Sequence, residues 1–379
     1  MKVALIGLGT VGRGAYDILK ARNDVLKETV GAIDIAYIVV TERSKERLSR
    51  ELEETVVTSS DYDRVLDEVD LVVEATGAID IAYDYMKRAL EKGIGVVTAN
   101  KAAVSAYYKE LTELAEKHRV PFLFEAAVGG GIPVLTPLRA LCLQNDIGSI
   151  RGILNGTCNY LINAMFKDGA DYDETLALCQ ELGYAEQDPT DDVEGYDTRR
   201  KLHILIEMAY GHIDGEAIPT KGIAQLTGPV VSYLKEHRKK VKLVASAKPV
   251  EGGIEAVVEP VVLDESDELA LLPDAINEVD IEGSWVGDVA FRGPGAGKEP
   301  TGNAVVSDIV SVLSNGALPL LSRGDVALKP VFGRYLVAEA LEGDFVETVD
   351  GDFTLTREME RDELLKHVDA ETFFARIDA

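Results

Sequence analysis

The sequence contains few cysteines and few histidines. It has three cysteines in 379 residues, Cys142, Cys158 and Cys179. Their odd number and scattered positions fit neither a disulfide framework nor a zinc site, so we expect a reducing compartment, the cytoplasm. The five histidines are spread along the chain without an HExxH pair, which argues against transition-metal chemistry.

Long apolar runs and positive charge are also scarce. No run of about 18 apolar residues occurs, so no membrane span is expected, and the N-terminus lacks the flanks of a signal peptide. Acidic residues number 66 against 39 basic ones, for a net charge of −27. Such an acidic protein repels nucleic acid and anionic membranes. Its surface suits a salt-rich cytoplasm, where ions screen the self-repulsion.

The N-terminal segment carries a glycine pattern with a physical purpose. An apolar strand, Val3 to Gly7, is followed by a helix that begins near residue 13. Between them, glycines allow a tight turn, close approach of a pyrophosphate, and helix–strand packing. The helix N-terminus favours the phosphate charges. The pattern predicts a dinucleotide site that includes Gly7, Gly9, Thr10, Val11 and Gly12.

A second strand at Ile35 to Val40 ends where a ribose-reading residue belongs. Glu42 would bind the 2′-hydroxyl of NAD, whereas Arg43 and Ser44 would suit the 2′-phosphate of NADP. The cofactor is therefore NAD or NADP, and these residues leave the choice open.

Short apolar strands then alternate with helices up to residue 125. This alternation predicts an α/β fold with a doubly wound parallel sheet, a Rossmann domain, over residues 1–131. Ligands bind at the carboxyl ends of such strands. Thr76 stands at one such end, where small residues let a nicotinamide lie against backbone. Lys101 stands at another, either as a surface lysine or facing the cofactor crevice.

The segment FEAAVGGGIP follows the last of these strands. Its three glycines would expose backbone carbonyls beside the Glu125 carboxylate, which are the ligands of a hard cation. A flexible crossover between domains is the alternative on spacing alone.

From Ile132 the pattern indicates a second, α+β domain with a largely antiparallel sheet, over residues 132–299. The turn NGTCNY opens a helix in which Thr157 is a plausible N-cap. Cys158 is either a nucleophile or a buried small side chain. The basic stretch Lys235 to Lys248 is interpreted as a partly helical, solvated face. A glycine-rich loop near Gly297 either approaches the cofactor or is a linker, and a helix at about 300–320 returns to the first domain.

The stretch GYAEQDPTDDVEGYDTRRKL gathers carboxylates and one ammonium. Pro189 would sit in the first turn of a helix that carries Asp192, Asp197 and Lys201. Asp197 and Lys201 are four residues apart and share a helical face, so they form either a solvated ion pair or part of a site. Residues 325–379 read as strands and a charged helix, a C-terminal extension without an assigned role.

Seven segments occur in one order along residues 1 to 315, namely GLGTVG, ATG, TANK, FEAAVGGGIP, RGILNGTCNY, LGYAEQDPTDDVEGYDTRRKL and GPGAGKEPTGNAVVSDI. Together they resemble the homoserine dehydrogenase family. The resemblance implies an oxidoreductase that uses NAD(P)H to reduce L-aspartate 4-semialdehyde reversibly to L-homoserine, on the route to threonine, methionine and isoleucine. It also implies a homodimer through the second-domain sheet. The tail does not match a complete ACT regulatory domain.

The resemblance also implies roles for residues at matching positions. Lys201 stands at the family's general acid/base lysine and Lys101 at the cofactor–substrate boundary; which of them donates the proton stays open. Substrate contacts are implied for Glu186 and Asp197, with Asp192 nearby. The positions that border the cofactor are Thr76, Gly183 and Gly297. The family's monovalent-cation (Na or K) loop is matched by Glu125, Val128, Gly130 and Ile132, the latter three through backbone carbonyls.

Two other functions are conceivable. One is a thiol-dependent aldehyde dehydrogenase with Cys158 as nucleophile. The other is a dinucleotide-sensing regulator that kept the fold without the chemistry, which the presence of both lysines and the acidic residues argues against.

Overall fold

The structure is a computed structural model that describes residues 1–169, 171–181, 187–321 and 323–378. The chain forms two compact units. The first comprises Met1–Leu143 and the segment from Pro294, and the second comprises Gln144–Gly293 and the segment from Arg323. Residues 132–143 therefore pack with the first unit. The assignment of separate functions to residues 1–131, 132–299 and 325–379 remains a prediction.

A parallel sheet forms the centre of the first unit. Within the described residues it has six strands in the order β3-β2-β1-β4-β5-β6, and all of its neighbouring pairs are parallel. The predicted doubly wound sheet is confirmed. Its strands are β1 (Lys2–Ile6), β2 (Asp34–Val40), β3 (Thr55–Thr58), β4 (Leu71–Glu74), β5 (Gly95–Thr98) and β6 (Phe122–Leu123).

Helices of the first unit follow the strands and cover the sheet. They are α1 (Thr10–Thr29), α2 (Glu42–Glu51), α3 (Tyr62–Leu66), α4 (Ile79–Glu91), α5 (Lys101–His118), α6 (Leu135–Gln144) and α12 (Lys298–Leu313). Buried strand residues such as Leu5 and Val73 share one core with Ala15 of α1 and Ile309 of α12. Because the strands are buried on both faces, they read as nearly continuous apolar runs.

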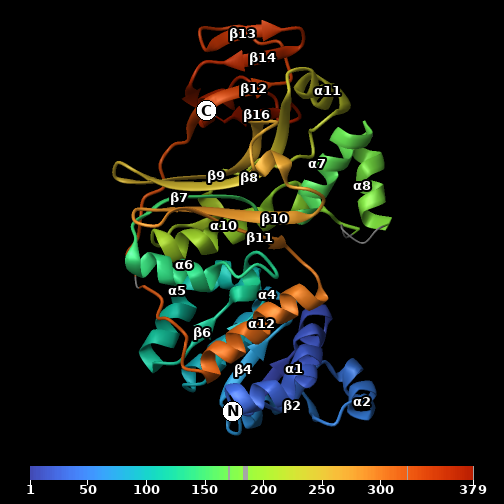
Figure 1. The fold of residues 1–379 in the computed structure, drawn as a ribbon, viewed down its shortest axis with the longest axis vertical. Helices are drawn as coiled ribbons and strands as arrows, with labels where there is room; N and C mark the ends of the chain where they lie inside the picture. Colours follow the sequence, from blue (N-terminus) through green and yellow to red (C-terminus); the bar gives the residue numbers. More distant parts are fainter. Residues whose placement is uncertain (170, 182–186, 322, 379) are drawn as a thin grey trace. The chain divides into compact units, whose positions relative to one another are not determined.

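Helix α12 returns from late in the sequence to lie beside α1, as Figure 1 shows in orange and blue. The contact depends on small residues. A Cβ on Gly14 would lie 2.2 Å from the Lys298 carbonyl oxygen, and one on Gly302 would lie 2.6 Å from the Ala15 nitrogen. The two backbones therefore approach more closely than any larger residue permits.

The second unit contains a mixed sheet, mostly antiparallel. Over the described residues its order is β11-β10-β7-β8-β9-β16-β12-β14-β13, with β15 paired to β12, and β16 runs parallel to β9. The strands are β7 (Ile147–Ile153), β8 (Lys239–Val250), β9 (Gly253–Asp264), β10 (Ile276–Gly283), β11 (Gly287–Pro294), β12 (Phe332–Val337), β13 (Val346–Asp350), β14 (Phe353–Thr356), β15 (Met359–Glu360) and β16 (Phe374–Ile377).

Helices of this unit pack on and beside the sheet. They are α7 (Gly156–Asp168), α8 (Tyr172–Glu181), α9 (Thr190–Val193), α10 (Tyr196–Ala209), α11 (Gly228–Glu236) and α13 (Arg361–Leu364). Helix α10 contacts β7, β8 and β9 and is buried along most of its length. The prediction of a partly helical stretch at Lys235 to Lys248 is largely wrong. Apart from the end of α11 it is the strand β8, because its apolar residues fit between β7 and β9.

The C-terminal segment extends this sheet. Strand β16 pairs with β9, and β12, β14 and β13 follow outward, in red in Figure 1. A buried carboxylate joins the two parts. The Oε2 atom of Glu259 on β9 lies 3.2 Å from Nε of Arg361 on α13, and its Oε1 lies 2.7 Å from Nε of Arg376 on β16. The second contact is ionic, since its angles do not suit a hydrogen bond.

Two absences hold for the residues that the structure describes. None of their helices has the length and apolarity needed to cross a membrane. No three or more of their His, Cys, Asp and Glu side chains are arranged to hold a metal ion. The three cysteines are buried, and none of them forms a disulfide bond within the described chain.

Candidate active site

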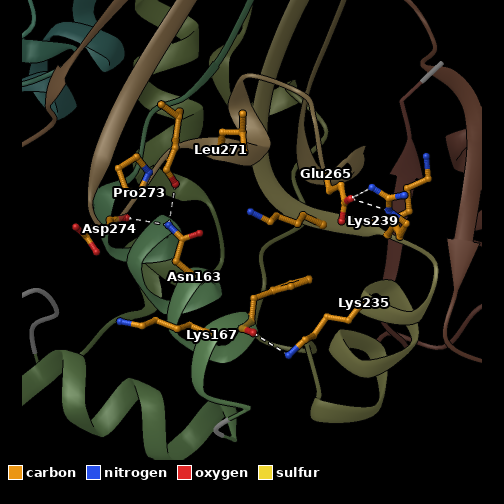
Figure 2. Close-up of a pocket in the computed structure, with 12 residues that line it drawn as sticks. Asn163, Lys167, Lys235, Lys239, Glu265, Leu271, Pro273 and Asp274 are labelled. Atoms are coloured by element: carbon orange, nitrogen blue, oxygen red, sulfur yellow. Dashed lines mark hydrogen bonds and ion pairs between the residues drawn. The ribbon is translucent and has the colours of Figure 1, made fainter.

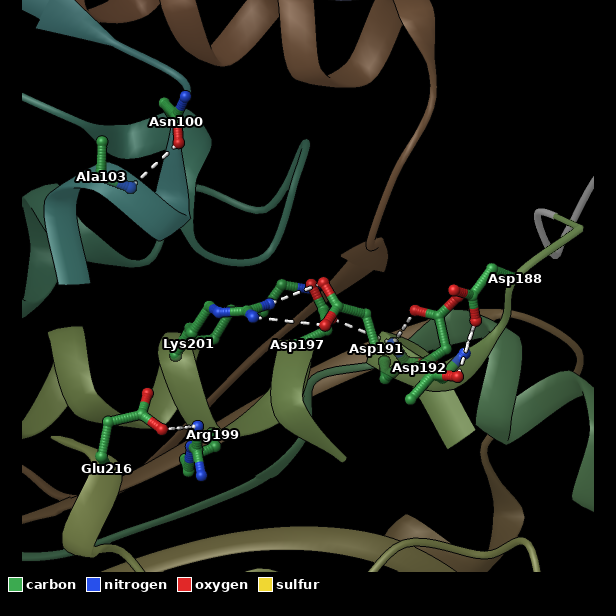
Figure 3. Close-up of polar contacts among 12 residues, drawn as sticks. Asn100, Ala103, Asp188, Asp191, Asp192, Asp197, Arg199, Lys201 and Glu216 are labelled. Atoms are coloured by element: carbon green, nitrogen blue, oxygen red, sulfur yellow. Dashed lines mark hydrogen bonds and ion pairs between the residues drawn. The ribbon is translucent and has the colours of Figure 1, made fainter. Parts of the chain in front are cut away.

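Lys201 and Asp197 form a buried ion pair on α10. Their side chains point toward each other in Figure 3, and Lys201 Nζ lies 2.7 Å from Asp197 Oδ2. The same ammonium donates a hydrogen bond of 2.6 Å to the carbonyl oxygen of Leu154, which follows β7. Lys201 is 8% exposed and Asp197 4%. The prediction that they share a helical face is confirmed, and the pair is not a solvated one.

The helix that was predicted to carry Asp192 together with this pair is divided in two. Asp192 lies on the short helix α9, and α10 begins after Gly195. Gly195 has a φ of 83°, in the left-handed region that favours glycine. Pro189 is the N-cap of α9 and not a residue of its first turn. The break turns the chain between the two acidic residues.

Asn155 connects these parts of the site. Its Nδ2 donates to Asp192 Oδ1 at 2.6 Å and to Asp197 Oδ2 at 3.0 Å, and its Oδ1 accepts from the Cys158 N–H at 2.8 Å. Asn155 is therefore the N-cap of α7, and the prediction of Thr157 in that role is wrong. Asparagine at the cap satisfies a helix N–H while its amide group reaches both carboxylates.

Cys158 is poorly placed for nucleophilic chemistry. Its side chain is 1% exposed and its Sγ donates to the Asp192 carbonyl oxygen at 3.1 Å. Burial and then the charges of Asp192 and Asp197 raise the pKa of this thiol. The thiolate is the reactive form, so these surroundings oppose it.

In the first unit, the turn between β1 and α1 has the shape that a dinucleotide requires. A Cβ on Gly12 would lie 2.2 Å from the Gly7 carbonyl oxygen, whereas nothing lies within 4 Å of a Cβ built on Gly9. Gly9 and Thr10 are exposed, and Val11 is half-buried. The turn is thus closed toward the protein and open toward solvent at the helix N-terminus, where N–H groups lack helical partners.

A hydrogen-bond network joins the turns that carry Thr76 and Lys101. The Glu74 carboxylate, at the end of β4, accepts from the Thr76 N–H and O–H at 2.6 and 2.5 Å and from the Thr98 hydroxyl at 2.6 Å. Burial raises the pKa of Glu74. Asn100 donates to the Thr76 carbonyl oxygen at 3.1 Å and caps α5, whose first residue is Lys101. The network fixes both turns at one edge of the sheet.

Arg43 lies exposed in the first turn of α2, directly after β2. Glu42 is exposed beside it, and the Thr41 hydroxyl donates to Ser44 Oγ at 3.3 Å. Both an acid and a base are therefore accessible at the end of this strand.

The Glu125 carboxylate has a structural role that the sequence did not reveal. Its oxygens accept from the N–H groups of Val134, Leu135 and Thr136 at 2.6 to 2.8 Å and from the Thr136 hydroxyl at 2.6 Å. It therefore caps the start of α6. Four donors occupy this carboxylate, so a cation in the adjoining loop would be held mainly by backbone carbonyls.

The backbone of that loop does offer such ligands. Val128, Gly130 and Ile132 are buried, and within the described chain none of their carbonyl oxygens accepts a hydrogen bond. Buried carbonyls without a partner are uncommon and call for an ion or a water molecule. The glycine-rich loop packs on the same segment, since a Cβ on Gly130 would lie 2.3 Å from the Gly295 carbonyl oxygen. Gly297 then caps α12.

The structure thus groups the described candidates within each unit. Asp192, Asp197 and Lys201 meet in the second unit, and Thr76 and Lys101 are linked in the first. Gly183 and Glu186 lie outside the residues that the structure describes. The sequence analysis missed Asn155, Glu74 and Asn100 as organising residues. For Asn155 a signal was present, since Asn is among the preferred N-caps.

Models of two protein families match the chain. "Homoserine dehydrogenase, NAD binding domain" matches residues 7–125, and "Homoserine dehydrogenase" matches residues 133–310. A homoserine dehydrogenase of Bacillus subtilis is 37% identical over 318 residues, which are 83% of this chain and 73% of that relative. The chain belongs to the homoserine dehydrogenase family. It is an oxidoreductase that acts on a CH–OH group and has an NAD-binding domain.

Solved structures of homoserine dehydrogenases resemble all or most of the chain. One from Thiobacillus denitrificans has a TM-score of 0.88 at 32% identity and covers 100% of this chain and 98% of its own. A hyperthermophilic archaeal homoserine dehydrogenase in complex with NADPH has a TM-score of 0.70 at 25% identity, covering 84% of this chain and 99% of its own. The C-terminal segment thus lies within the part of the chain that the Thiobacillus structure matches.

Proposed function

We propose that the buried Lys201–Asp197 pair is the catalytic centre for the reversible conversion of L-aspartate 4-semialdehyde to L-homoserine with NAD(P)H. The product would feed threonine, methionine and isoleucine synthesis. A bound nicotinamide cofactor supplies the hydride to the aldehyde carbon. The protein must then stabilise the developing alkoxide and give it a proton.

Lys201 has the geometry for this task. An ammonium has three N–H donors, and those of Lys201 bond to Asp197 and to the Leu154 carbonyl. The third donor has no acceptor within the described residues and would point to the substrate oxygen. In a site from which water is excluded, such a donor stabilises an oxyanion far better than in solution. The carboxylate and the carbonyl hold the ammonium in place.

The substrate carries an α-ammonium and an α-carboxylate, and both need partners. We assign Asp192 and Asp197, with Glu186, to the substrate's ammonium end and Lys101 to its carboxylate or its reacting oxygen. The Asn155 amide supports this assignment, since its bonds at 2.6 and 3.0 Å keep the two aspartates apart and oriented. Proton donation by Lys101 is the alternative, because this lysine begins α5 at the edge of the sheet.

For the cofactor, we propose that Gly7 to Gly12 hold the pyrophosphate and that Thr76, Gly183 and Gly297 border the nicotinamide. The exposed Arg43 would bind a 2′-phosphate, so NADP is the preferred cofactor. The NADPH complex of the archaeal relative supports this choice. The accessible Glu42 beside Arg43 favours NAD instead, and a direct comparison of the two cofactors decides between them.

We further propose a Na or K site formed by the carbonyls of Val128, Gly130 and Ile132 together with Glu125. The unpaired, buried carbonyls carry this proposal. Cations of this kind prefer several oxygen ligands from a loop. Buried cysteines that form no disulfide bond within the described chain support a cytoplasmic location. A homodimer formed through the second-unit sheet and the absence of nucleic-acid binding are also proposed.

The test is the oxidation of homoserine followed by absorbance, with NAD and NADP side by side. We expect Lys201→Ala to lower kcat by about 10²- to 10⁴-fold, the usual contribution of a positioned acid or base. Binding of NADPH, measured by fluorescence titration, should stay within about twofold, because Lys201 is assigned to the substrate. Arg200→Ala is the matched control, since Arg200 is the neighbour of Lys201 on α10 and pairs instead with the exposed Asp191 of α9.

Near-normal turnover of Lys201→Ala would remove this lysine from the mechanism and leave Lys101 as the donor. Tight cofactor binding without turnover in the unaltered protein would support the sensing regulator instead. Inactivation by iodoacetamide that substrate prevents would point to the thiol route.

A further inference from the structure

The second unit contains a pocket of about 520 Å³ at the end of α7, and its lining does not include Lys201, Asp197 or Asn155. Figure 2 shows its wall formed by the end of α7, the turn between α11 and β8, and the loop before β10. Five of the lining residues are cations, namely Lys167, Lys235, Arg238, Lys239 and Lys240. The lining carboxylates are Glu265 and Asp274.

Two of these cations are neutralised by acids. Arg238 donates from Nε and Nη2 to Glu265 Oε1, and Lys239 Nζ lies 3.3 Å from Asp264 Oδ2. Both pairs are exposed and stand at the rim. They leave the pocket's charge to the other three lysines and to the carboxylate of Asp274.

The other three lysines have no carboxylate within ion-pair distance in the described part of the chain. Lys235 donates to the Phe166 carbonyl oxygen and Lys240 to the Ala270 carbonyl oxygen, both at 3.0 Å. Lys167 is exposed at the end of α7. These three lysines line one pocket of a chain that has 66 acids and 39 bases. Their grouping around one pocket produces a local positive field against the charge of the whole molecule.

A buried lysine beneath the pocket strengthens this field. Lys242 is fully buried, and its Nζ donates to Asn159 Oδ1, Asn163 Oδ1 and the Leu272 carbonyl at 2.6, 2.7 and 3.2 Å. Burial and then the charge of Lys240 lower its pKa to about 7. Its bonded acceptors are neutral, so they do not cancel the charge. Two ammoniums that repel each other would both be stabilised by an anion in the pocket.

The opposite part of the lining is apolar. Phe166, Leu271, Leu272 and Pro273 line it, and Leu271 is 58% exposed although its side chain is large. An inorganic ion alone would leave this apolar surface in water. A ligand that carries an organic group beside its charge would cover it.

We propose that this pocket binds a phosphorylated small molecule, its phosphoryl group held by Lys235, Lys240 and Lys167 and its organic part against the apolar lining. Lysines bind a phosphoryl group as point charges from several directions. A carboxylate ligand would be favoured by the planar guanidinium group of an arginine. The arginine of the lining, Arg238, already donates to Glu265. The ligand is thus a phosphate ester or an oligophosphate. This site does not depend on the reaction proposed for Lys201.

Isothermal titration with inorganic pyrophosphate and with AMP tests the proposal. The dinucleotide site is first saturated with NADP, and the salt is kept near 0.1 M. We expect saturable binding of at least one probe. Tighter binding of AMP would identify an organic phosphate as the ligand, and tighter binding of pyrophosphate an oligophosphate. The double variant Lys235→Gln/Lys240→Gln should weaken binding at least about tenfold, the effect of one lost charged hydrogen bond.

The matched control is Lys248→Gln/Lys366→Gln. It removes the same two charges from the same unit, where Lys248 pairs with Glu255 and Lys366 with Glu363. Binding should change by less than about twofold, because distant exposed charges are screened. The single variant Lys167→Gln, on an exposed residue, tests the site without altering the packed strand β8. Absence of binding by both probes, or equal weakening by test and control variants, would overturn the proposal.

Discussion

In the first unit, the buried carboxylates of Glu74 and Glu125 bond to N–H and O–H groups, whereas in the second unit Asp197 and Glu259 lie against cations. Within the described residues, no cation lies within ion-pair distance of Glu74 or Glu125. The two units thus stabilise buried negative charge by different means. In the first unit, the neutral N–H and O–H groups that donate to a carboxylate belong to turns and helix ends, so these hydrogen bonds also fix the shape of those turns and helix ends.

In the second unit, the buried carboxylates of Asp197 and Glu259 each depend on an opposite charge. Removing one partner of such a pair leaves an uncompensated charge, which usually costs more than a lost neutral hydrogen bond. The first unit thus holds the turns proposed for the cofactor by hydrogen bonds between neutral donors and Glu74, while the second unit holds the ammonium of Lys201, the proposed catalytic group, by electrostatics. The loss of activity expected for Lys201→Ala is the largest effect that follows from this difference.

The next largest effect concerns Glu259. The variant Glu259→Gln should lower the free energy of unfolding by about 3–5 kcal/mol, because Arg361 and Arg376 lose their counter-charge in a buried place. Urea unfolding measures the change. Glu265→Gln is the control, since its pair with Arg238 is exposed and should contribute about 1 kcal/mol or less. If Glu259→Gln lowers the free energy of unfolding no more than Glu265→Gln does, the two units do not differ in how they stabilise buried negative charge.

A smaller effect is expected for Glu125→Gln. The amide keeps one acceptor oxygen, but its NH₂ group faces donors at the start of α6, so some N–H groups lose their partner. The expected loss is about 1–3 kcal/mol in urea unfolding. It should fall below that of Glu259→Gln, because no opposite charge is left behind. The reverse order would show that neutral donors stabilise a buried carboxylate as strongly as arginines do.

The smallest effect is a pH dependence in the first unit. Asp308 on α12 is buried and accepts the Glu125 N–H at 2.8 Å. Burial, and then the charge of Glu125, raise its pKa from 3.8 to about 8. Because the folded state holds the proton more tightly, this group stabilises most below about pH 4, and its contribution is lost as the pH rises toward 8.

The variant Asp308→Asn keeps an acceptor for the Glu125 N–H and cannot ionise. Between pH 6 and 7, the unaltered protein should lose about 1.4 kcal/mol of unfolding free energy relative to this variant. Urea unfolding of both proteins at the two pH values measures the difference, and other titrating groups cancel in it. Parallel stability curves would show that Asp308 is ionised across this range.

Much of the fold could be predicted from periodicity and glycine placement. The parallel sheet follows from apolar strands alternating with helices, and the open turn at Gly9 follows from the spacing of the glycines around it. The ion pair of Asp197 and Lys201 follows from their separation of four residues. Each of these depends on neighbours in sequence, for which local geometry is decisive.

Other features depend on residues far apart in sequence. The sequence suggested Glu125 as a cation ligand, but it gave no sign that this carboxylate also bonds to the N–H groups at the start of α6. The role of Asn155 is visible only in the structure, where its side chain donates to Asp192 and Asp197. The basic stretch at Lys235 to Lys248 looked like a solvated face, yet pairing with β7 and β9 made most of it a strand and brought its first lysines to a pocket.

Patterns among neighbouring residues specify the local elements, the glycine turn proposed for the cofactor and the chemical groups available for reduction of an aldehyde. Which of those groups are held together depends on the folded chain, because burial and long-range hydrogen bonds choose the partners. Glu259 and Arg361, which are 102 residues apart, illustrate the reason. No periodic pattern connects them, and they meet because the C-terminal segment pairs with β9.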